Sequence, residues 1–460
     1  MIRRVLVAAC AVLAATCAQP SPWARAAVPT PGAPQTRPVA IVDAAIHPVS
    51  GPVIENGTIV FDGGRIVAVG ASGAVAVPPA AERVDGRGLH VYPSLVDPFT
   101  PLGLVEISSV RATVDSREVG RINPGGRAEV AYHPESDLLP VTRSNGVLVA
   151  GVAPDGAGLL PGQAAAMVLD GWTWEDATLR APIGMVVNWP GMLLVRGEGA
   201  PPEEKQKESR DQALRTLRAA FADARAYQAA KRSATGGGPF ATDLRWEAMV
   251  PVLERKVPLF VVAEEILQIE AAVAFAQAES LRLVLVGGYD APEAATLLAR
   301  NDVPVIVSAI HRLPRRRGDP YDAAYTVPAR LARAGVRFAI ANGSSWNERN
   351  LPYAAATAAA YGLSADQALR SITLDAASIL GIADRVGSLE PGKDATLFVT
   401  TGDPLEQPSE VVRAWIGGRA VDLNDRQKTL NEKYREKYRR LATPAAAGNA
   451  GAASGGGVGR

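Results

Sequence analysis

Short apolar runs separated by turn residues fill the chain from residue 38 to residue 92. Residues 39–42, 57–61 and 65–69 are rich in Val, Ile and other residues that pack well on a pleated sheet. Asp62-Gly63-Gly64 joins the last two runs and is a hairpin signal, because glycine adopts the positive φ of tight turns. The pattern predicts a small β domain.

Farther along, apolar runs of strand length alternate with segments whose apolar residues recur at helical spacing. The predicted strands are 259–262, 283–286, 303–307 and 336–341, and the predicted helices lie within 209–232, 266–273, 290–298 and 329–334. Residues 290–293 and 364–367 both have the sequence of a capping box, which starts a helix. The alternation favours parallel βα units. Residues 111–190 are rich in Gly and Pro, and their strands cannot all be assigned.

The N-terminus has the pattern of a targeting segment. Arg3 and Arg4 precede an apolar run, residues 5–16, which is too short to span a bilayer, and Ala24-Arg25-Ala26 is a small-X-small cleavage site. We therefore predict a secretory signal peptide over 1–26, followed by a flexible linker over 27–37. An uncleaved anchor and a lipoprotein attached through Cys17 are the alternatives.

Both cysteines, Cys10 and Cys17, lie inside the predicted signal peptide. A mature chain without cysteine excludes disulfides, thiolate ligands and a cysteine nucleophile. A signal peptide without a disulfide framework indicates a bacterial periplasm, and we expect no transmembrane span in the mature chain.

Two further features bound the interpretation. The chain carries 48 basic and 47 acidic side chains, so its net charge gives no argument for binding nucleic acid. Residues 424–441 are charged and helical, with Leu430, Tyr434 and Tyr438 on one stripe. We expect this helix to pack on the surface of the protein; a partner-binding helix is the alternative.

The stretch Val96-Asp97-Pro98-Phe99-Thr100-Pro101-Leu102 resembles the first barrel strand of the amidohydrolase superfamily, where an apolar pair and an Asp precede a His-X-His pattern. Residues 383–395 resemble the segment by which those chains leave the barrel. The resemblance implies an α/β fold, a (β/α)8 TIM-like barrel with a small β-sandwich built from the N- and C-terminal segments. The implied bounds are 38–92 and 388–422 for the sandwich and 93–387 for the barrel. After them, the charge pattern predicts a C-terminal helix over 423–442, and the Ala-, Gly- and Ser-rich composition predicts a disordered tail over 443–460.

The same resemblance assigns a site at the ends of the barrel strands. In that family, His residues of the first, fifth and sixth strands hold a metal ion, and an Asp after the eighth strand takes a proton from bound water. The first-strand positions here are Phe99 and Pro101, which offer no lone pair to a metal. The other positions that line the pocket by resemblance are Val262, Glu264, Gly287, Asn342, Gly343 and, before Phe99, Asp97.

These substitutions predict a degenerate site. The family resemblance implies hydrolysis of carbon–nitrogen bonds other than peptide bonds, closest to imidazolonepropionase-like and prolidase-like members, with zinc or another divalent metal. Here no metal and no other cofactor is expected. The four histidines, His47, His90, His133 and His311, are too scattered in the sequence to rebuild a three-His site.

Glu264 has two interpretations. It is either a substrate contact or a ligand of a relocated metal, or it is a charge paired with Arg312, which we favour. Arg312 and Arg315-Arg316-Arg317 form a basic loop, either simply solvated or an anion-binding lid.

Three hypotheses for function remain. The first is a periplasmic binding or partner protein on an amidohydrolase scaffold, with a small-molecule ligand or a paralogous subunit. The second is a metal-independent hydrolase using Glu264 and His311, with Asn342 as a further candidate. The third is a conventional metal hydrolase whose ligands lie at positions other than those aligned above.

Overall fold

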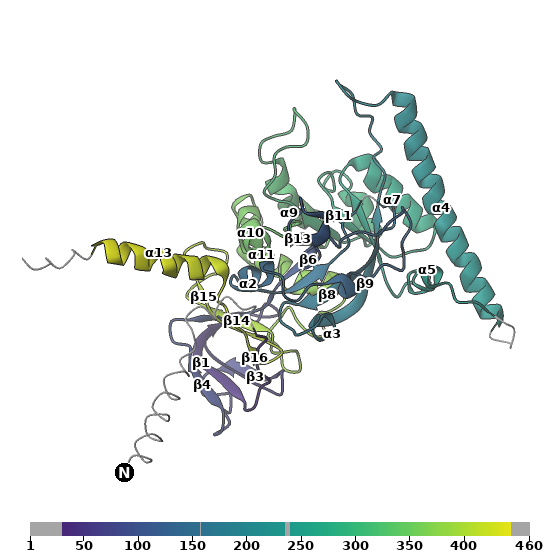
Figure 1. Ribbon diagram of the computed structural model, residues 1–460. Coiled ribbons are helices and arrows are strands. Elements are labelled where there is room, and N and C mark those ends of the chain that lie inside the picture. Colours follow the sequence, from purple (N-terminus) through teal and green to yellow (C-terminus); the bar gives the residue numbers. More distant parts are fainter. Residues whose placement is uncertain (1–29, 157, 235–239, 443–460) are drawn as a thin grey trace, which may run out of the picture. The chain divides into compact units, whose positions relative to one another are not determined.

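The computed structural model describes residues 30–442 except 157 and 235–239 (Figure 1). The predicted signal peptide, the first residues of the predicted linker and the predicted C-terminal tail lie outside the described residues. Residues 30–37 have no regular secondary structure, but Gln35 donates to the carbonyl of Phe61 (2.9 Å) and accepts from the Gly64 N–H (2.9 Å). Within the described part of the chain, no helix combines the length and apolar character needed to cross a bilayer.

The first sheet is built from both ends of the described chain. Its strands are β1 (Val39–Ile46), β2 (Ile54–Asp62), β3 (Arg65–Ala71), β4 (Glu82–Asp85), β5 (His90–Pro93), β14 (Leu397–Thr400), β15 (Val411–Ile416) and β16 (Arg419–Ala420). β5 pairs antiparallel with β14, which joins the two segments. Phe61 on β2 and Trp415 on β15 lie edge to face at 5.5 Å although three strands separate them in the sheet order. The sheet therefore folds back on itself around its own small core.

The second sheet is the barrel. In sequence order its strands are β6 (Leu95–Thr100), β7 (Val147–Val152), β8 (Gly162–Val168), β9 (Thr178–Asn188), β10 (Leu259–Ala263), β11 (Leu283–Gly287), β12 (Val305–Ser308) and β13 (Phe338–Ala341), and they neighbour one another in that order. The predicted TIM-like barrel with a sheet built from both ends is confirmed. β8 departs from the ideal, since it runs antiparallel to both neighbours. Its connections, 153–161 and 169–177, are shorter than the dozen or so residues that a parallel crossover needs.

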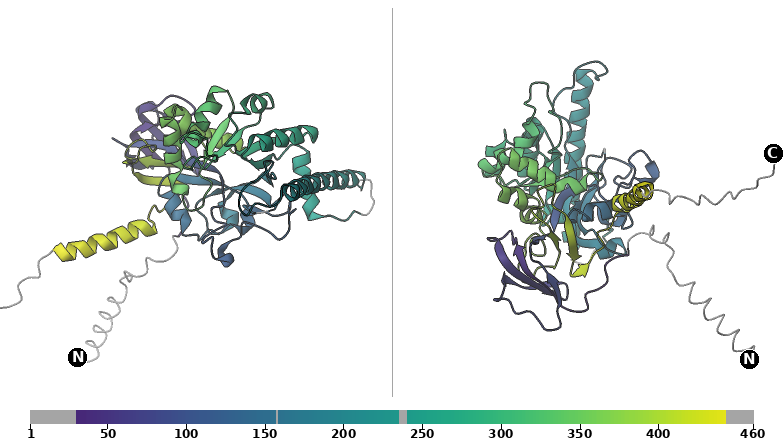
Figure 2. Two further views of the ribbon diagram at one scale, coloured as in Figure 1. Left: turned by 90° about the horizontal axis from the view of Figure 1, so that it is seen from above. Right: turned by 90° about the vertical axis from the view of Figure 1, so that its left-hand side faces the viewer.

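Helices cover the outside of the barrel (Figures 1 and 2). They are α2 (Leu138–Arg143), α3 (Trp174–Ala177), α4 (Glu203–Ala234), α5 (Leu244–Glu247), α6 (Val250–Leu253), α7 (Ile266–Ala278), α8 (Ala295–Arg300), α9 (Ala323–Arg333), α10 (Leu351–Ala360), α11 (Ala365–Ser371) and α12 (Leu374–Ile379), with 3-10 turns η2 (Arg111–Thr113), η3 (Ala128–Ala131) and η4 (Glu348–Asn350). On the long α4, Leu217 and Phe221 are buried, and Phe221 meets Phe275 of α7 edge-on at 5.2 Å. Burial of each such side chain contributes about 2 kcal/mol.

Two local predictions fared differently. The capping box at Ser364 and Gln367 is present at the start of α11. The one predicted at residues 290–293 is wrong, because α8 begins later, at Ala295, without a side-chain cap. The Asp290 carboxylate has other partners. It accepts a hydrogen bond from the N–H of Ile266 at the start of α7 and forms an ion pair with Arg316.

The C-terminal helix α13 (Arg426–Ala442) does not pack as expected. None of its residues is buried, and Leu430, Tyr434 and Tyr438 are 39%, 49% and 64% exposed. Lys437 lies over both tyrosine rings, with its Nζ 6.0 Å and 5.7 Å from their centroids. The exposed Lys437 side chain thus covers only part of the stripe, and both tyrosine rings remain in contact with water.

The barrel closes between β13 and β6 through a buried carboxylate. Asp97, completely buried on β6, accepts the N–H of Phe99 through Oδ1 (2.9 Å) and the N–H of Asn342 through Oδ2 (2.9 Å). Because Asn342 directly follows β13, this carboxylate ties the last strand to the first. Asp97, predicted by position to line the pocket, therefore belongs to the barrel seam.

A second carboxyl group lies against the first. Glu348 on η4 is 1% exposed and accepts a hydrogen bond from the Thr100 hydroxyl (2.6 Å). Its other carboxyl oxygen, Oε2, is buried without a hydrogen-bond partner among the described atoms. Burial first, and then the neighbouring Asp97 carboxyl, raise the pKa of Glu348 well above its ordinary value. Two adjacent buried carboxyls cannot both ionise cheaply, so the pair holds one proton. Sequence reasoning missed Glu348; the available signal was an acid shortly after the last barrel strand.

The seam pair makes stability depend on pH. Because the pKa of Glu348 is raised, its contribution is complete below the ordinary Glu value of about 4.3 and is lost as pH rises toward the raised pKa. Glu348→Gln keeps a neutral side chain that can donate to Asp97. We expect the midpoint of thermal unfolding of this variant to fall less between pH 5 and 8 than that of the wild type, as followed by circular dichroism.

Glu348→Ala is the companion variant. It should lower the free energy of unfolding by about 2 kcal/mol, since it leaves a cavity and removes the acceptor of the Thr100 O–H. Equal pH dependence of the wild type and Glu348→Gln would contradict a shared proton at the seam.

Candidate functional site

The predicted site positions surround the mouth of the barrel, where the parallel strands have their carboxyl ends. Phe99 is half-buried, and its ring centroid lies 6.3 Å from that of the buried Phe260 of β10. Pro101 follows it and lacks even a backbone N–H. Val262, near the end of β10, is also half-buried. These three positions give the mouth an apolar lining without a metal ligand.

Glu264 directly follows β10 and is held by the basic loop. Its Oε1 accepts from the Arg312 guanidinium at 2.7 Å, and its Oε2 accepts the N–H of Tyr289 at 3.0 Å. The guanidinium also lies over the Tyr289 ring, 5.2 Å from its centroid. The Glu264 and Arg312 side chains are only 21% and 18% exposed. The expected pairing of Glu264 with Arg312 is present.

The rest of the basic loop is pinned in the same way. Arg315 lies 3.5 Å from Glu265, and Arg316 is paired with the buried Asp290. The Tyr289 hydroxyl donates to Asp319 at 2.7 Å, which together with Arg316 lowers the pKa of Asp319. The loop is therefore neither simply solvated nor an open anion-binding lid, because three of its arginines are matched by carboxylates.

Two glycines occupy positions where the family resemblance would put a functional side chain. Gly287 has φ 99°, and a Cβ there would lie 3.0 Å from both the Ala263 carbonyl oxygen and Glu264 Cδ. Gly343 has φ 71°, which also favours glycine. A histidine at Gly287 would thus be strained by the positive φ and would crowd Glu264.

Asn342 is committed to local structure. Its backbone N–H donates to Asp97, and its side-chain amide donates to the carbonyl of Asn347. An amide has no basic lone pair at neutral pH, so Asn342 positions the turn after β13.

The histidines do not gather at the mouth. His311 hydrogen-bonds the Thr357 hydroxyl of α10 at 2.7 Å, and burial lowers its pKa. His47 and His90 contact each other at 3.0 Å in the first sheet, where burial and His90 lower the pKa of His47 to about 4. His133 pairs with Glu135. The structure does not pair Glu264 with His311; each has a different hydrogen-bond partner.

The donor set can be tested against the metal that the family resemblance implies. Among the described residues, no three His, Cys, Asp or Glu side chains are placed to hold a metal ion. The carboxylates near the mouth are used by arginine or by backbone amides, as described for Glu264 and Asp97. The residues present do not fit a divalent cation.

A cavity of about 480 Å³ lies beside the mouth, between the end of β9 and the start of α4. Trp189, Met192 and Leu193 supply apolar lining, and Arg121 and Lys205 supply positive charge. The Trp189 ring N–H is buried without a hydrogen-bond partner among the described atoms. Such a cavity fits a molecule with an apolar body and an anionic group.

Gln268 connects this cavity to Glu264. Its Oε1 accepts the N–H of Glu264 (3.1 Å), while its Nε2 donates to the carbonyl of Trp189 (3.1 Å). Sequence reasoning missed the cavity because it lies partly in the irregular segment; the signal was Trp189-Pro190-Gly191-Met192 after an apolar run.

Comparisons with known proteins bear on the fold. Residues 324–421, which run from α9 through the last barrel strand to the end of the first sheet, match the amidohydrolase family. An amidohydrolase from Thermotoga maritima has the same fold, with a TM-score of 0.73 and 26% identity over 84% of this chain and 99% of that chain.

Two curated relatives match in part. The imidazolonepropionase of Erwinia tasmaniensis is 48% identical over 58 residues, 13% of this chain and 13% of its own length. An amidohydrolase of Hapsidospora irregularis is 24% identical over 385 residues, 75% of this chain. The chain thus spans only 13% and 38% of the lengths of these two relatives. The chain is thus similar to amidohydrolases in the sequence of residues 324–421 and in the barrel and the sheet joined from both ends.

Proposed function

We propose that this amidohydrolase-family protein no longer hydrolyses by the metal route and that the cavity beside its barrel mouth holds a small ligand. The observation that carries the proposal is the Glu264–Arg312 ion pair, 2.7 Å long and mostly buried. A carboxylate in this state must first lose its guanidinium before it can bind a metal or remove a proton. Separating a largely buried pair is costly, because each charge is then left without a partner.

The cavity beside the mouth indicates the class of ligand. Its apolar side chains and its three basic residues, Arg121, Lys205 and Arg210, favour a molecule with an apolar part and a carboxylate or similar anion. That chemistry also describes the acids released by hydrolysis of amides, so the scaffold can keep the binding preference of a hydrolase without its reaction. The pattern of residues 1–26 supports export to the periplasm as the place of binding.

A metal-independent hydrolase is the second candidate. It draws on Glu264, which stands at the carboxyl end of a barrel strand, where this fold puts catalytic groups. His311, its proposed partner, bonds Thr357, so a productive pair requires the loop at residues 309–322 to move.

Metal content tests the loss of the metal route. After exchange into metal-free buffer and again after loading with zinc, we expect elemental analysis to find far less than one zinc per chain, because no donor cluster fits the ion. A well-known zinc hydrolase handled in parallel is the control. Retention of one zinc per chain in this protein would overturn the proposal.

Hydrolysis in the presence of EDTA separates the two candidates. We expect wild type and Glu264→Gln to release no amino acid from a panel of N-acyl amino acids, measured by liquid chromatography against buffer alone. EDTA-resistant release that disappears in Glu264→Gln would establish the second candidate in place of the first.

Binding at the cavity can be measured with 1-anilinonaphthalene-8-sulfonate, an aromatic anion whose fluorescence rises on binding. Leu193→Glu puts a negative charge on the cavity wall and should weaken binding at least fivefold. Leu313→Glu, at an 86% exposed position outside the cavity, is the matched control and should bind like the wild type. Equal affinities for all three proteins would show that the probe binds elsewhere.

A further inference from the structure

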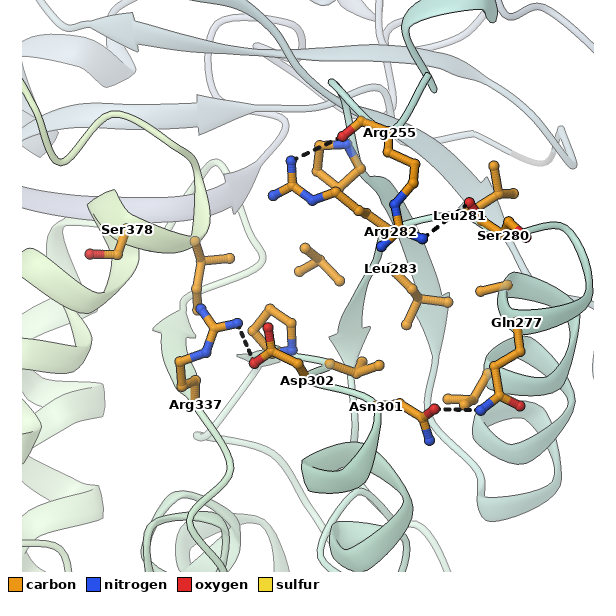
Figure 3. A pocket seen from close by; sticks show the side chains of 17 residues that line it. Arg255, Gln277, Ser280, Leu281, Arg282, Leu283, Asn301, Asp302, Arg337 and Ser378 are labelled. Atoms are coloured by element: carbon orange, nitrogen blue, oxygen red, sulfur yellow. Dashed lines mark hydrogen bonds and ion pairs between the residues drawn. The ribbon is translucent and has the colours of Figure 1, made fainter. Parts of the chain in front are cut away.

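A second cavity lies at the end of the barrel opposite the mouth. It has a volume of about 530 Å³ and is lined by the residues that lead into β10, β11, β12 and β13, together with the end of α12 (Figure 3). Because these segments precede the strands, the cavity opens at their amino ends, whereas Glu264 and Asn342 stand at the carboxyl ends. The volume is in the range of small-molecule sites.

Three arginines line this cavity against one carboxylate. Arg337 is paired with Asp302 at 2.8 Å. The guanidinium groups of Arg255 and Arg282 have no carboxylate partner among the described residues; they donate to the carbonyls of Ser280 (3.5 Å) and Arg255 (3.3 Å). Figure 3 shows these two arginines on one wall and the Arg337–Asp302 pair on another. The cavity therefore carries an excess of two positive charges.

The acidic residues nearest in sequence to the cavity residues form ion pairs with other cations. Glu254, next to Arg255, pairs with Lys256 at 2.8 Å. Glu279, next to Ser280, pairs with Arg225 of α4 at 2.9 Å. Arg255 and Arg282 thus form no ion pair with these carboxylates, although the acids are close to them in sequence.

The backbone at this end adds a second line of evidence. Arg255, Ser280 and Asp302 occupy the left-handed turn between a helix and the next strand, with φ of 62°, 55° and 51°. The equivalent turn before β13 has Gly335, with φ 69°. A side chain in this conformation costs about 1 kcal/mol relative to glycine. The three turns that accept this cost are those whose side chains line the cavity.

We propose that this cavity binds a small organic dianion, a phosphate monoester or a dicarboxylate. Guanidinium groups donate two parallel hydrogen bonds to either kind of oxyanion. Gln277 and Asn301, hydrogen-bonded to each other on the cavity wall, offer further amide groups, and Pro258 and Leu283 offer apolar surface to the organic part. The site is separate from the mouth and does not rest on the function proposed for it.

Isothermal titration calorimetry with two probes, inorganic phosphate and succinate, tests the proposal on the purified protein. We expect at least one probe to bind, and the probe that binds more tightly identifies the head group. Arg255→Gly with Arg282→Gln removes both uncompensated charges and should weaken binding at least tenfold. Glycine suits the backbone at residue 255, so this double variant should unfold at the same temperature as the wild type or higher.

Two further variants sharpen the result. Arg83→Gln with Arg435→Gln removes two exposed charges elsewhere and should bind like the wild type, which excludes a mere effect of net charge. Asp302→Asn removes the carboxylate that competes for Arg337; asparagine tolerates positive φ, so the fold should be kept and binding should tighten about threefold. No heat from either probe at millimolar concentration, or equal affinities for the wild type and the Arg255→Gly, Arg282→Gln variant, would overturn the proposal.

Discussion

The buried carboxyl pair of Asp97 and Glu348 holds the barrel closed at the one junction that lacks a strand ladder among the described strands. The sheet order begins at β13 and ends at β6, so the seam depends on side chains. Asp97 takes one amide from each side of the seam, and Glu348 fixes the turn after β13 through Thr100. Because both carboxyls are buried, a shared proton lowers the free energy of the arrangement by removing one of the two buried negative charges.

The seam explains part of the chemistry of the mouth. The Asp97 carboxylate is completely buried and accepts two backbone amides, so it is not open to a ligand. Glu264 is occupied too, by Arg312 and by the amide of Tyr289. At the positions where the family places metal ligands and a base, the chain thus has apolar side chains, glycines, an amide and one neutralised acid. The mouth is held together by pairs within the chain, and what remains open for binding is the neighbouring cavity at Trp189.

Local sequence signals predicted those elements whose stability is local. The hairpin at Asp62-Gly63-Gly64 and the capping box at Ser364 depend on residues within a few positions of each other, so the pattern was sufficient. The capping box at Asp290 failed because its carboxylate is claimed by residues far away in sequence, Ile266 and Arg316. The stripe on α13 failed because helical spacing shows which residues share a face, but not whether anything covers it.

The site followed the same rule. That Phe99, Pro101 and Gly287 stand at the family's ligand positions stays a prediction from the resemblance, whereas the partner of Glu264 was expected and is present. Glu348 was invisible, because its role depends on meeting Asp97 across a seam that only the closed barrel creates. The antiparallel β8 was also beyond reach, since the Gly- and Pro-rich segment around it carries no helix period to mark a crossover.

Glycine is used in opposite ways at the two ends of the barrel. At the mouth, Gly287 takes a conformation suited to glycine, and a side chain there would crowd Glu264. At the other end, Arg255, Ser280 and Asp302 hold a conformation in which glycine would be cheaper, and each directs a side chain to the same cavity. Gly335 makes the fourth of these helix-to-strand turns and does not line the cavity. The conformational cost at three of them, paired with arginines left without carboxylates, is best explained by a requirement for those side chains.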